Sequence, residues 1–157
     1  MTNRQAIEAA KARFGDVLEQ QLERVERLRL EGDWTDYSAV RPLVIGMIGG
    51  DGIGPTISAA TQRVLEHLLK DEVESGKVRF RVIEGLTIEN RAAKMQAIPD
   101  DVLADIKKCH VTLKGPTHTP EKGDGWPNIE SANVSMRKEL DLFANVRPVR
   151  IPKENID

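Results

Sequence analysis

The densest group of residues that could do chemistry consists of Ser131, Asn133 and Arg137. Asn133 and Arg137 are four residues apart, so on a helix they share one face, and Ser131 stands just before them, near the helix N-terminus. A hydroxyl, an amide and a guanidinium beside N-terminal backbone donors suit a carboxylate, because Arg pairs with it bidentately and the helix dipole attracts it. Arg147 and Arg150 follow and could add a second pair of cations. The alternative is an amphipathic helix with solvated polar groups, capped by Ser131.

The polar stretch from Lys114 to Pro120 is a second candidate site. Lys114 supplies a cation, His118 an imidazole and Thr119 a hydroxyl, directly after a short apolar run that should be a strand. In open α/β sheets the loops at the carboxyl ends of strands carry ligands. These residues therefore predict a binding loop, although an ordinary polar loop would have the same composition.

A glycine-rich turn, Gly50-Asp51-Gly52-Ile53-Gly54-Pro55, follows another apolar run and opens a helix. Glycines let backbone N–H groups come close to a ligand, and a helix N-terminus favours an anion. The spacing departs from a dinucleotide fingerprint, because Gly54 comes one residue early and Glu84 comes later than the acid expected about 20 residues on. Three interpretations stay open: a structural tight turn, a ligand-facing loop of another α/β family, or a dinucleotide site.

No motif in the chain forms a metal site or a nucleophilic triad by itself. His67 and His110 have no ligand-spaced neighbours, and the HExxH, CxxC and GxSxG motifs are absent. Cys109 is the only cysteine, which excludes an intrachain disulfide and suits a reducing compartment. The residues alone therefore predict no metal site.

Apolar periodicity predicts the elements that position these residues. The expected elements are a helix over 5–31, a strand over 43–48, a helix over 56–70, a strand over 78–84, a helix over 99–108, a strand over 110–114, a helix over 131–141 and a strand over 146–151. Strands that alternate with helices are typical of an open α/β sheet. Prolines limit the last strand to a sheet edge.

The expected first helix stands apart from this pattern. One apolar stripe runs along a charged helix that should stop near Gly32, and it consists of Ile7, Phe14, Leu18, Leu22, Val25 and Leu28. Such a stripe needs a partner surface, and the alternatives are packing on its own domain, a subunit contact or a free tail. We therefore divide the chain into residues 1–40, a helix with a linker, and residues 41–157, the α/β portion.

Composition excludes several classes of protein. The 157 residues are 39% hydrophobic and 31% charged, with a formal net charge of -2, so neither disorder nor nucleic acid binding is expected. No apolar run reaches the roughly 20 residues of a membrane span. The N-terminus lacks the apolar core of a secretory signal, and its acids do not suit a mitochondrial transit peptide. We therefore expect a cytoplasmic protein with no membrane partner.

Four segments, in order, resemble the isocitrate and isopropylmalate dehydrogenase family over residues 43–157. They are Ile48-Gly49-Gly50-Asp51-Gly52-Ile53-Gly54-Pro55, Leu113-Lys114-Gly115-Pro116, Ser131-Ala132-Asn133 through Arg137, and Leu140-Asp141-Leu142-Phe143-Ala144-Asn145-Val146-Arg147-Pro148. One such segment would be weak, whereas four at matching intervals are specific. The chain looks most like the N-terminal part of a bacterial-type isocitrate dehydrogenase, and about the first 40 residues lie outside the resemblance.

The resemblance implies an α/β fold with strand-helix-strand units of an open mixed sheet, of which this chain holds the N-terminal portion. It also implies oxidative decarboxylation of isocitrate to 2-oxoglutarate, with NAD or NADP taking the hydride and Mg²⁺ or Mn²⁺ acting as a Lewis acid. The complete enzyme would be a homodimer whose active site forms between domains and between subunits.

The same resemblance implies roles for five residues in substrate binding. Arg137 and Arg147 would bind substrate carboxylates. Ser131 and Asn133 would bind the carboxylate that distinguishes isocitrate from its relatives, and Lys114 would lie near it. Isopropylmalate enzymes usually carry apolar residues in place of the Ser-x-Asn pair, so isocitrate is the expected substrate.

The resemblance puts Thr119 near the nicotinamide end of the cofactor, with His118 beside it. NADP-using bacterial members often carry Thr-Thr where this chain has His118-Thr119, so the contacts with NAD or NADP stay open. The family's catalytic Tyr and Lys, its metal-binding aspartates and its adenosine-binding loop lie downstream, so we expect no catalytic and no metal-binding residue in this chain. The chain should be inactive alone. The alternatives are a relative acting on 3-isopropylmalate, homoisocitrate or tartrate, or a non-catalytic partner-binding module.

Overall fold

The computed structural model of the chain describes residues 2–30 and 35–148. It divides into two compact units, residues 1–39 and 40–157. The elements are α1 (Asn3–Leu30), β1 (Leu43–Ile48), α2 (Gly54–Leu68), α3 (Lys70–Glu74), β2 (Val78–Val82), α4 (Ile88–Lys94), α5 (Asp100–Ile106), β3 (Val111–Lys114) and α6 (Ala132–Glu139).

The first unit contains the helix α1, which follows the predicted range closely. None of its 28 residues is buried, and the whole predicted apolar stripe is exposed. Arg27 and Arg29 occupy the last turn, where cations favour the negative end of the helix dipole. The predicted stop at Gly32 lies outside the described residues. The structure therefore offers the stripe as exposed surface.

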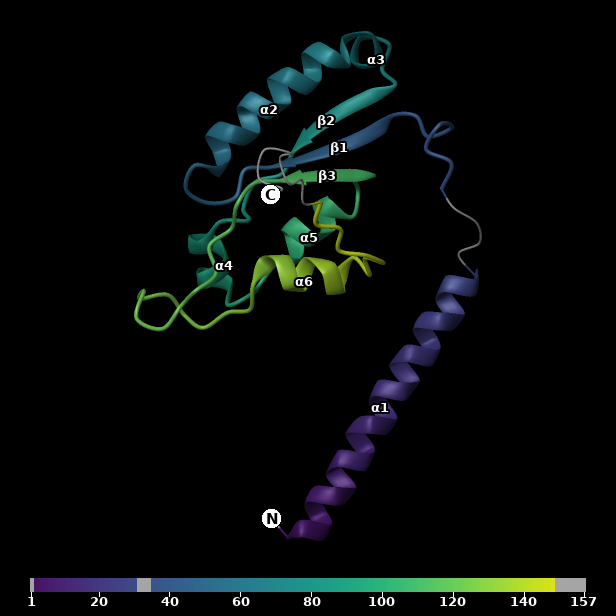
Figure 1. The fold of residues 1–157 in the computed structure, drawn as a ribbon, viewed down its shortest axis with the longest axis vertical. Coiled ribbons are helices and arrows are strands. Elements are labelled where there is room, and N and C mark those ends of the chain that lie inside the picture. The colour runs from purple at the N-terminus through teal and green to yellow at the C-terminus, as the bar shows by residue number, and fades with distance from the viewer. Residues whose placement is uncertain (1, 31–34, 149–157) are drawn as a thin grey trace, which may run out of the picture. The chain divides into compact units, whose positions relative to one another are not determined.

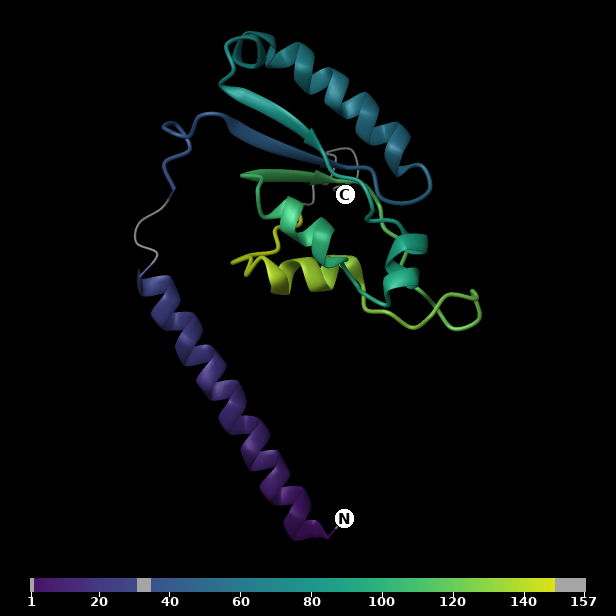
Figure 2. The same cartoon turned by 180° about the vertical axis from the view of Figure 1, so that it is seen from behind.

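The second unit is built on a parallel sheet with the order β2-β1-β3. The central strand β1 pairs with both neighbours, for example Ile45 with Phe80 on one side and with Val111 on the other. Figures 1 and 2 show α2 on one face of this sheet and α5 with α6 on the other. Parallel strands end at the same edge, so the loops after β1 and β3 meet there, and α4 lies beyond that edge (Figure 1).

The core lies between the sheet and α5 with α6. It contains the buried residues Ile48, Ile83, Leu86, Ile98, Val102, Ile106 and Ala132. The sequence predicts that Val102, Leu103 and Ile106 line one side of α5, and this is confirmed, with Leu103 partly buried. The predicted α/β fold class is confirmed, and the three described strands are all parallel.

The spacing of the apolar residues of α2 predicts that they share one face, but this is not the buried face of the helix; the residues are Ile57, Ala60, Val64, Leu65 and Leu68. Ile57, Val64 and Leu68 are 45%, 57% and 69% exposed. The face that packs on the sheet instead starts with Gly54 and Ser58, and the Ser58 hydroxyl donates to the carbonyl of Ile48. Small residues let the helix approach the strand closely, and the hydrogen bond satisfies the buried hydroxyl.

Several predicted boundaries need correction. Two short helices, α3 and α4, are absent from the prediction, and the helix expected over 56–70 ends at Leu68. Pro99 is the N-cap residue of α5 rather than part of its first turn. The edge strand predicted over 146–151 is wrong for residues 146–148, which form no strand, and its remainder lies outside the described residues.

Candidate functional site

The glycine turn after β1 packs directly on the loop after β3. The N–H of Asp51 donates to the carbonyl of Pro116 at 2.8 Å. Gly50 has a φ of +73°, and a Cβ there would lie 2.1 Å from the same Pro116 oxygen. A Cβ on Gly54 would lie 2.0 Å from the oxygen of Gly49. Close backbone approach thus accounts for two glycines of the turn, which favours the structural interpretation.

The carboxylate of Asp51 joins three segments at this edge of the sheet. One oxygen accepts the N–H of Ile88, the first residue of α4, and the other accepts the N–H of His118, both at 2.7 Å. A carboxylate that accepts two backbone N–H groups is a strong, directional anchor. The turn after β1 is therefore fixed to both α4 and the loop after β3.

Arg91 on α4 is completely buried. Its guanidinium donates to three backbone carbonyls: Nε to Ala97 at 2.8 Å, Nη1 to His118 at 2.6 Å and Nη2 to Glu130 at 2.9 Å. Burial lowers the pKa of Arg91, and the negative charge of Asp51 opposes that shift. Three strong acceptors compensate for the loss of hydration, so the guanidinium can stay charged inside the protein.

Lys114, at the end of β3, lies within electrostatic reach of Arg91 and Asp51. Its Nζ donates to the carbonyl of Gly115 at 2.6 Å and to the hydroxyl of Thr117 at 3.1 Å. Burial lowers the pKa of Lys114, the positive charge of Arg91 lowers it further, and Asp51 raises it. The lysine predicted to lie near a substrate carboxylate is thus a half-buried cation at the loop-bearing edge of the sheet.

The loop from residue 117 to 130 has no helix or strand and is held by Asp124. This carboxylate accepts the N–H groups of Glu121 and Trp126 and lies 3.0 Å from Nε2 of His118. The hydrogen bond from Glu121, then the one from His118, lower the pKa of Asp124 to about 2. The imidazole of His118 therefore contacts its own loop, whereas Thr119 is exposed, and their roles at the cofactor stay predictions.

The polar residues of α6 fall into two groups. In the first, the Glu130 carboxylate accepts hydrogen bonds from Ser135 Oγ at 2.8 Å and Lys138 Nζ at 2.6 Å. The hydrogen bond from Lys138, then the one from Ser135, lower the pKa of Glu130. These three side chains therefore satisfy one another's hydrogen-bonding groups.

The second group contains the three residues predicted to bind substrate. Ser131 occupies the N-cap position predicted for it, and its hydroxyl makes no capping hydrogen bond, so the amphipathic-helix alternative stays open. Asn133 and Arg137 are exposed. Among the residues that the structure describes, these three side chains make no hydrogen bond or ion pair with the protein. Their polar groups are thus available to a ligand.

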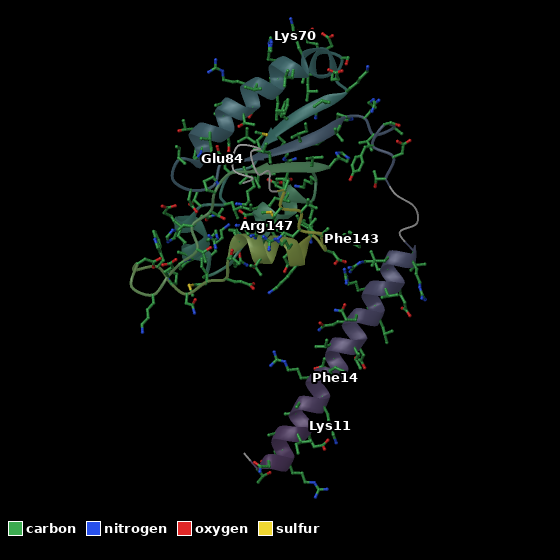
Figure 3. All side chains as sticks on the ribbon, in the orientation of Figure 1. Lys11, Phe14, Lys70, Glu84, Phe143 and Arg147 are labelled. Atoms are coloured by element: carbon green, nitrogen blue, oxygen red, sulfur yellow. The ribbon has the colours of Figure 1, made fainter. Side chains whose placement is uncertain are left out.

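The remaining predicted cations lie after α6. Arg147 is exposed, and Figure 3 labels it on the segment that follows α6. Phe143 on the same segment is fully exposed. Arg150 lies outside the described residues. The joint action of Arg147 with Ser131, Asn133 and Arg137 on one substrate stays a prediction.

A separate cleft of about 490 Å³ lies between α2 and the end of β2. Gly49, Ser58 and Gln62 line one side, and residues 82–87 line the other. None of the predicted substrate or cofactor residues lines it. We therefore place the candidate site at the 114–137 region, where the polar groups are, rather than at this cleft.

Sequence reasoning missed Asp51 and Arg91 as residues that organise the site. Asp51 lies inside the glycine-rich motif, but the two N–H groups that donate to its carboxylate are 37 and 67 residues away in the chain. A local signal for α4 does exist, because Thr87 accepts from the N–H of Asn90 as an N-cap residue should. Finding α4 would have shown Arg91 on a helix, but not that it is buried.

The described residues bring no three His, Cys, Asp or Glu side chains together in a way that could hold a metal ion. The described residues therefore do not fit a divalent metal by themselves. Nor is any helix in the described part of the chain long and apolar enough to cross a membrane.

Comparison with known proteins identifies relatives of the second unit. Residues 44–157 match the isocitrate/isopropylmalate dehydrogenase family. The NADP isocitrate dehydrogenase of Archaeoglobus fulgidus is 41% identical over 108 residues, which are 68% of this chain and 24% of that protein. The corresponding enzyme of Thermus thermophilus is 37% identical over 107 residues, 68% of this chain and 20% of that protein. Regulatory subunit 3 of the mitochondrial NAD isocitrate dehydrogenase of Arabidopsis thaliana is 33% identical over 122 residues, 74% of this chain and 29% of that protein. The chain thus spans about a quarter of the length of these relatives.

Proposed function

Because the chain belongs to the isocitrate/isopropylmalate dehydrogenase family, we propose that it forms the isocitrate-binding side of a dehydrogenase active site. The complete enzyme would convert isocitrate to 2-oxoglutarate and CO2 with reduction of NAD or NADP. Since the chain spans about a quarter of its relatives' length, the remaining catalytic groups would lie in the part of the enzyme that these residues do not span. The chain is expected to be inactive alone.

The observation that carries this proposal is the free polar face of α6. Ser131, Asn133 and Arg137 offer a hydroxyl, an amide and a guanidinium that the described protein does not use, near a helix N-terminus. Isocitrate presents three carboxylates and a hydroxyl, and a guanidinium binds a carboxylate through two parallel hydrogen bonds. The N-terminal backbone donors favour the same charge.

Other residues of this chain complete the proposed substrate site. Arg147 would bind a second carboxylate, and Lys114 would lie near the carboxylate held by Ser131 and Asn133. Burial keeps the Lys114 ammonium partly desolvated, which strengthens its attraction for an anion. Thr119 and His118 would approach the nicotinamide end of the cofactor.

Mg²⁺ or Mn²⁺ would supply Lewis-acid stabilisation of the developing enolate when bound in the complete enzyme. Its ligands would lie outside the described residues of this chain. A second copy of the complete protein, as a homodimer, is part of the same proposal. The cytoplasmic location stays a proposal too, because the relatives include subunits named as mitochondrial.

The proposal is tested by titrating the ¹⁵N-labelled chain with isocitrate and following amide signals by NMR. We expect shifts at Ser131, Asn133 and Arg137, and weaker binding of 3-isopropylmalate, which lacks the third carboxylate. Stronger binding of 3-isopropylmalate would favour a relative acting on that acid, and homoisocitrate and tartrate serve as further competitors. Shifts confined to the cleft between α2 and β2 would overturn the assignment of the site.

A matched pair of variants makes this titration specific. Arg137→Ala and Lys138→Ala each remove one positive charge from neighbouring positions of α6. Loss of two hydrogen bonds to a charged group should weaken isocitrate binding about 100-fold for Arg137→Ala. Lys138 already pairs with Glu130, so its loss should change binding much less. Equal effects of the two variants would mean that only net charge matters.

A second candidate function is a regulatory or partner-binding subunit without catalysis. Two relatives from Arabidopsis thaliana are named regulatory subunits, and the apolar stripe of α1 is exposed. Light scattering of the chain with and without residues 1–40 tests this function. Association that depends on those residues would support it, whereas unchanged association would remove α1 as the contact.

A further inference from the structure

Arg91 is the only completely buried cation among the described residues, and its contacts are unusual. Among the described residues, its three hydrogen bonds all go to main-chain carbonyls, and none goes to a carboxylate. The carbonyls belong to segments 6, 27 and 39 residues away in the chain. A buried guanidinium without a bonded counter-ion is costly unless its donors are satisfied, so these acceptors must stay in place.

Two of these carbonyls stand next to residues of the proposed site. His118 directly precedes Thr119, and Glu130 directly precedes Ser131. The residues between them form an irregular loop, so no helix or strand sets the distance between its ends. The planar guanidinium of Arg91 sets this distance instead, because Nη1 and Nη2 point in fixed directions. They donate to the carbonyls of His118 and Glu130 at 2.6 Å and 2.9 Å.

At the first end of the loop, both the N–H and the carbonyl of His118 are hydrogen-bonded. Asp51 accepts the N–H of His118 at 2.7 Å, while Arg91 binds the carbonyl of His118. Asp51 also holds the N–H of Ile88, at the start of the helix that carries Arg91. The turn after β1, helix α4 and the 118–130 loop therefore form one connected unit.

We propose that Arg91 is a positioning residue of the dehydrogenase site, which fixes the two ends of the 118–130 loop so that Thr119 and Ser131 reach their ligands together. This inference rests on the proposed function. Arg91 itself touches neither substrate nor cofactor, and it acts through the carbonyls of His118 and Glu130. Displacements of about 1 Å in such supporting groups are enough to weaken binding and catalysis strongly.

Lysine is the discriminating substitution at this position. It keeps the positive charge and most of the apolar stem, but its donors radiate from one nitrogen and cannot reach three separate carbonyls as the guanidinium does. We expect Arg91→Lys to release the loop ends while the sheet stays folded. Lys94→Gln is the matched control, because Lys94 is an exposed cation on the same helix that pairs with Asp101.

The experiment measures isocitrate binding and backbone order by NMR in the 157-residue chain, in Arg91→Lys and in Lys94→Gln. We expect Arg91→Lys to bind isocitrate about tenfold more weakly, equivalent to one lost hydrogen bond to a charged group. Backbone order should fall at residues 118–120 and 129–131 and stay unchanged in β1. Lys94→Gln should match the wild-type chain in both measurements.

The outcomes separate this inference from the proposed function. If the wild-type chain binds isocitrate and Arg91→Lys binds it equally well, the positioning role is wrong and the proposed function stands. The same holds if β1 loses order together with the loop, because Arg91 then supports only the fold. If the wild-type chain shows no shift at Ser131 or Asn133 with isocitrate, the proposed function fails and this inference fails with it.

A measurement on the wild-type chain covers the case in which Arg91→Lys does not fold. The Nη–H signals of Arg91 should shift on addition of isocitrate, because Nη1 and Nη2 donate to the carbonyls of His118 and Glu130, which directly precede residues of the proposed site. Constant Nη–H signals during a titration that shifts Ser131 and Asn133 would overturn the positioning role.

Discussion

Replacing Asp51 by Asn probes the connection between the glycine turn, α4 and the loop after β3. The two carboxylate oxygens accept the N–H groups of Ile88 and His118, both at 2.7 Å. Asparagine keeps one carbonyl oxygen and places an amide NH₂ where the second acceptor was. One backbone N–H therefore loses its partner and faces another donor.

The expected magnitude follows from these two bonds. A hydrogen bond to a charged group contributes roughly 1.5–3 kcal/mol, and an unsatisfied buried donor costs about 1–3 kcal/mol. The substitution also removes the negative charge that counteracts the lowering of the Arg91 pKa by burial. We expect Asp51→Asn to lower the free energy of unfolding by about 2–4 kcal/mol, a large part of the 5–15 kcal/mol typical of a domain.

Urea unfolding at pH 7, followed by circular dichroism, measures this change. Asp100→Asn is the control, because Asp100 is an exposed carboxylate in the first turn of α5 with Gln96 as its side-chain partner. The control should lie within about 0.5 kcal/mol of the wild type. If Asp51→Asn were as stable as the control, the two hydrogen bonds would not hold the turn as described.

Three further predictions concern the turn, the loop and the substrate helix. Gly54→Ala should destabilise the chain by about 1–3 kcal/mol in urea unfolding, because its Cβ would lie 2.0 Å from the Gly49 oxygen. Gly52→Ala should have the smaller effect of about 1 kcal/mol, since its Cβ meets no atom and only the φ of +57° is strained; the reverse order would contradict the packing. The pKa of Asp124 is lowered from 3.8 to about 2, so its hydrogen bonds stabilise the loop at pH values above 3.8 and are lost as the pH falls through about 2. The stability difference between wild type and Asp124→Asn, from unfolding at several pH values, should therefore shrink over that interval, and a constant difference would contradict the assignment. Ser131→Glu should abolish isocitrate binding in calorimetry through like-charge repulsion without unfolding the chain, and a full-strength complex would refute the role of Ser131.

The sequence predicts most of the architecture because its signals are local. The apolar run Leu43–Ile48, followed by a glycine turn and a helix, is sufficient to identify β1 and the start of α2. The spacing of Val102, Leu103 and Ile106 likewise identifies the buried face of α5. In these elements the apolar pattern and the packing agree.

The pattern fails where packing uses small or polar residues. The sheet-facing side of α2 begins with Gly54 and Ser58, whereas the large apolar residues Ile57, Val64 and Leu68 are exposed, so the apolar face of the sequence is not the packed face. Helix α4 has only seven residues, too few for a periodic signal, and one of its two buried residues is Arg91. Hydrophobicity alone cannot predict a buried arginine.

The candidate site likewise has one part that the sequence predicts and one part that it does not. Ser131, Asn133 and Arg137 could be recognised because their spacing on a helix is a local property. The supporting contacts could not, because Asp51 and Arg91 bind partners up to 67 and 39 residues away. Such contacts depend on how the turn after β1, helix α4 and the 118–130 loop are arranged in the fold, and they leave no periodic pattern in the sequence.

The central claim is that α6 of this chain binds isocitrate, and a transplant tests it most directly. Residues 44–157 would replace the matching region of the Archaeoglobus fulgidus NADP isocitrate dehydrogenase, and kcat/KM would be measured for isocitrate and 3-isopropylmalate. We predict a higher kcat/KM for isocitrate, reduced about 100-fold by Arg137→Ala and little changed by Lys138→Ala. A folded transplant that prefers 3-isopropylmalate, or that turns over isocitrate equally well without Arg137, would contradict the claim.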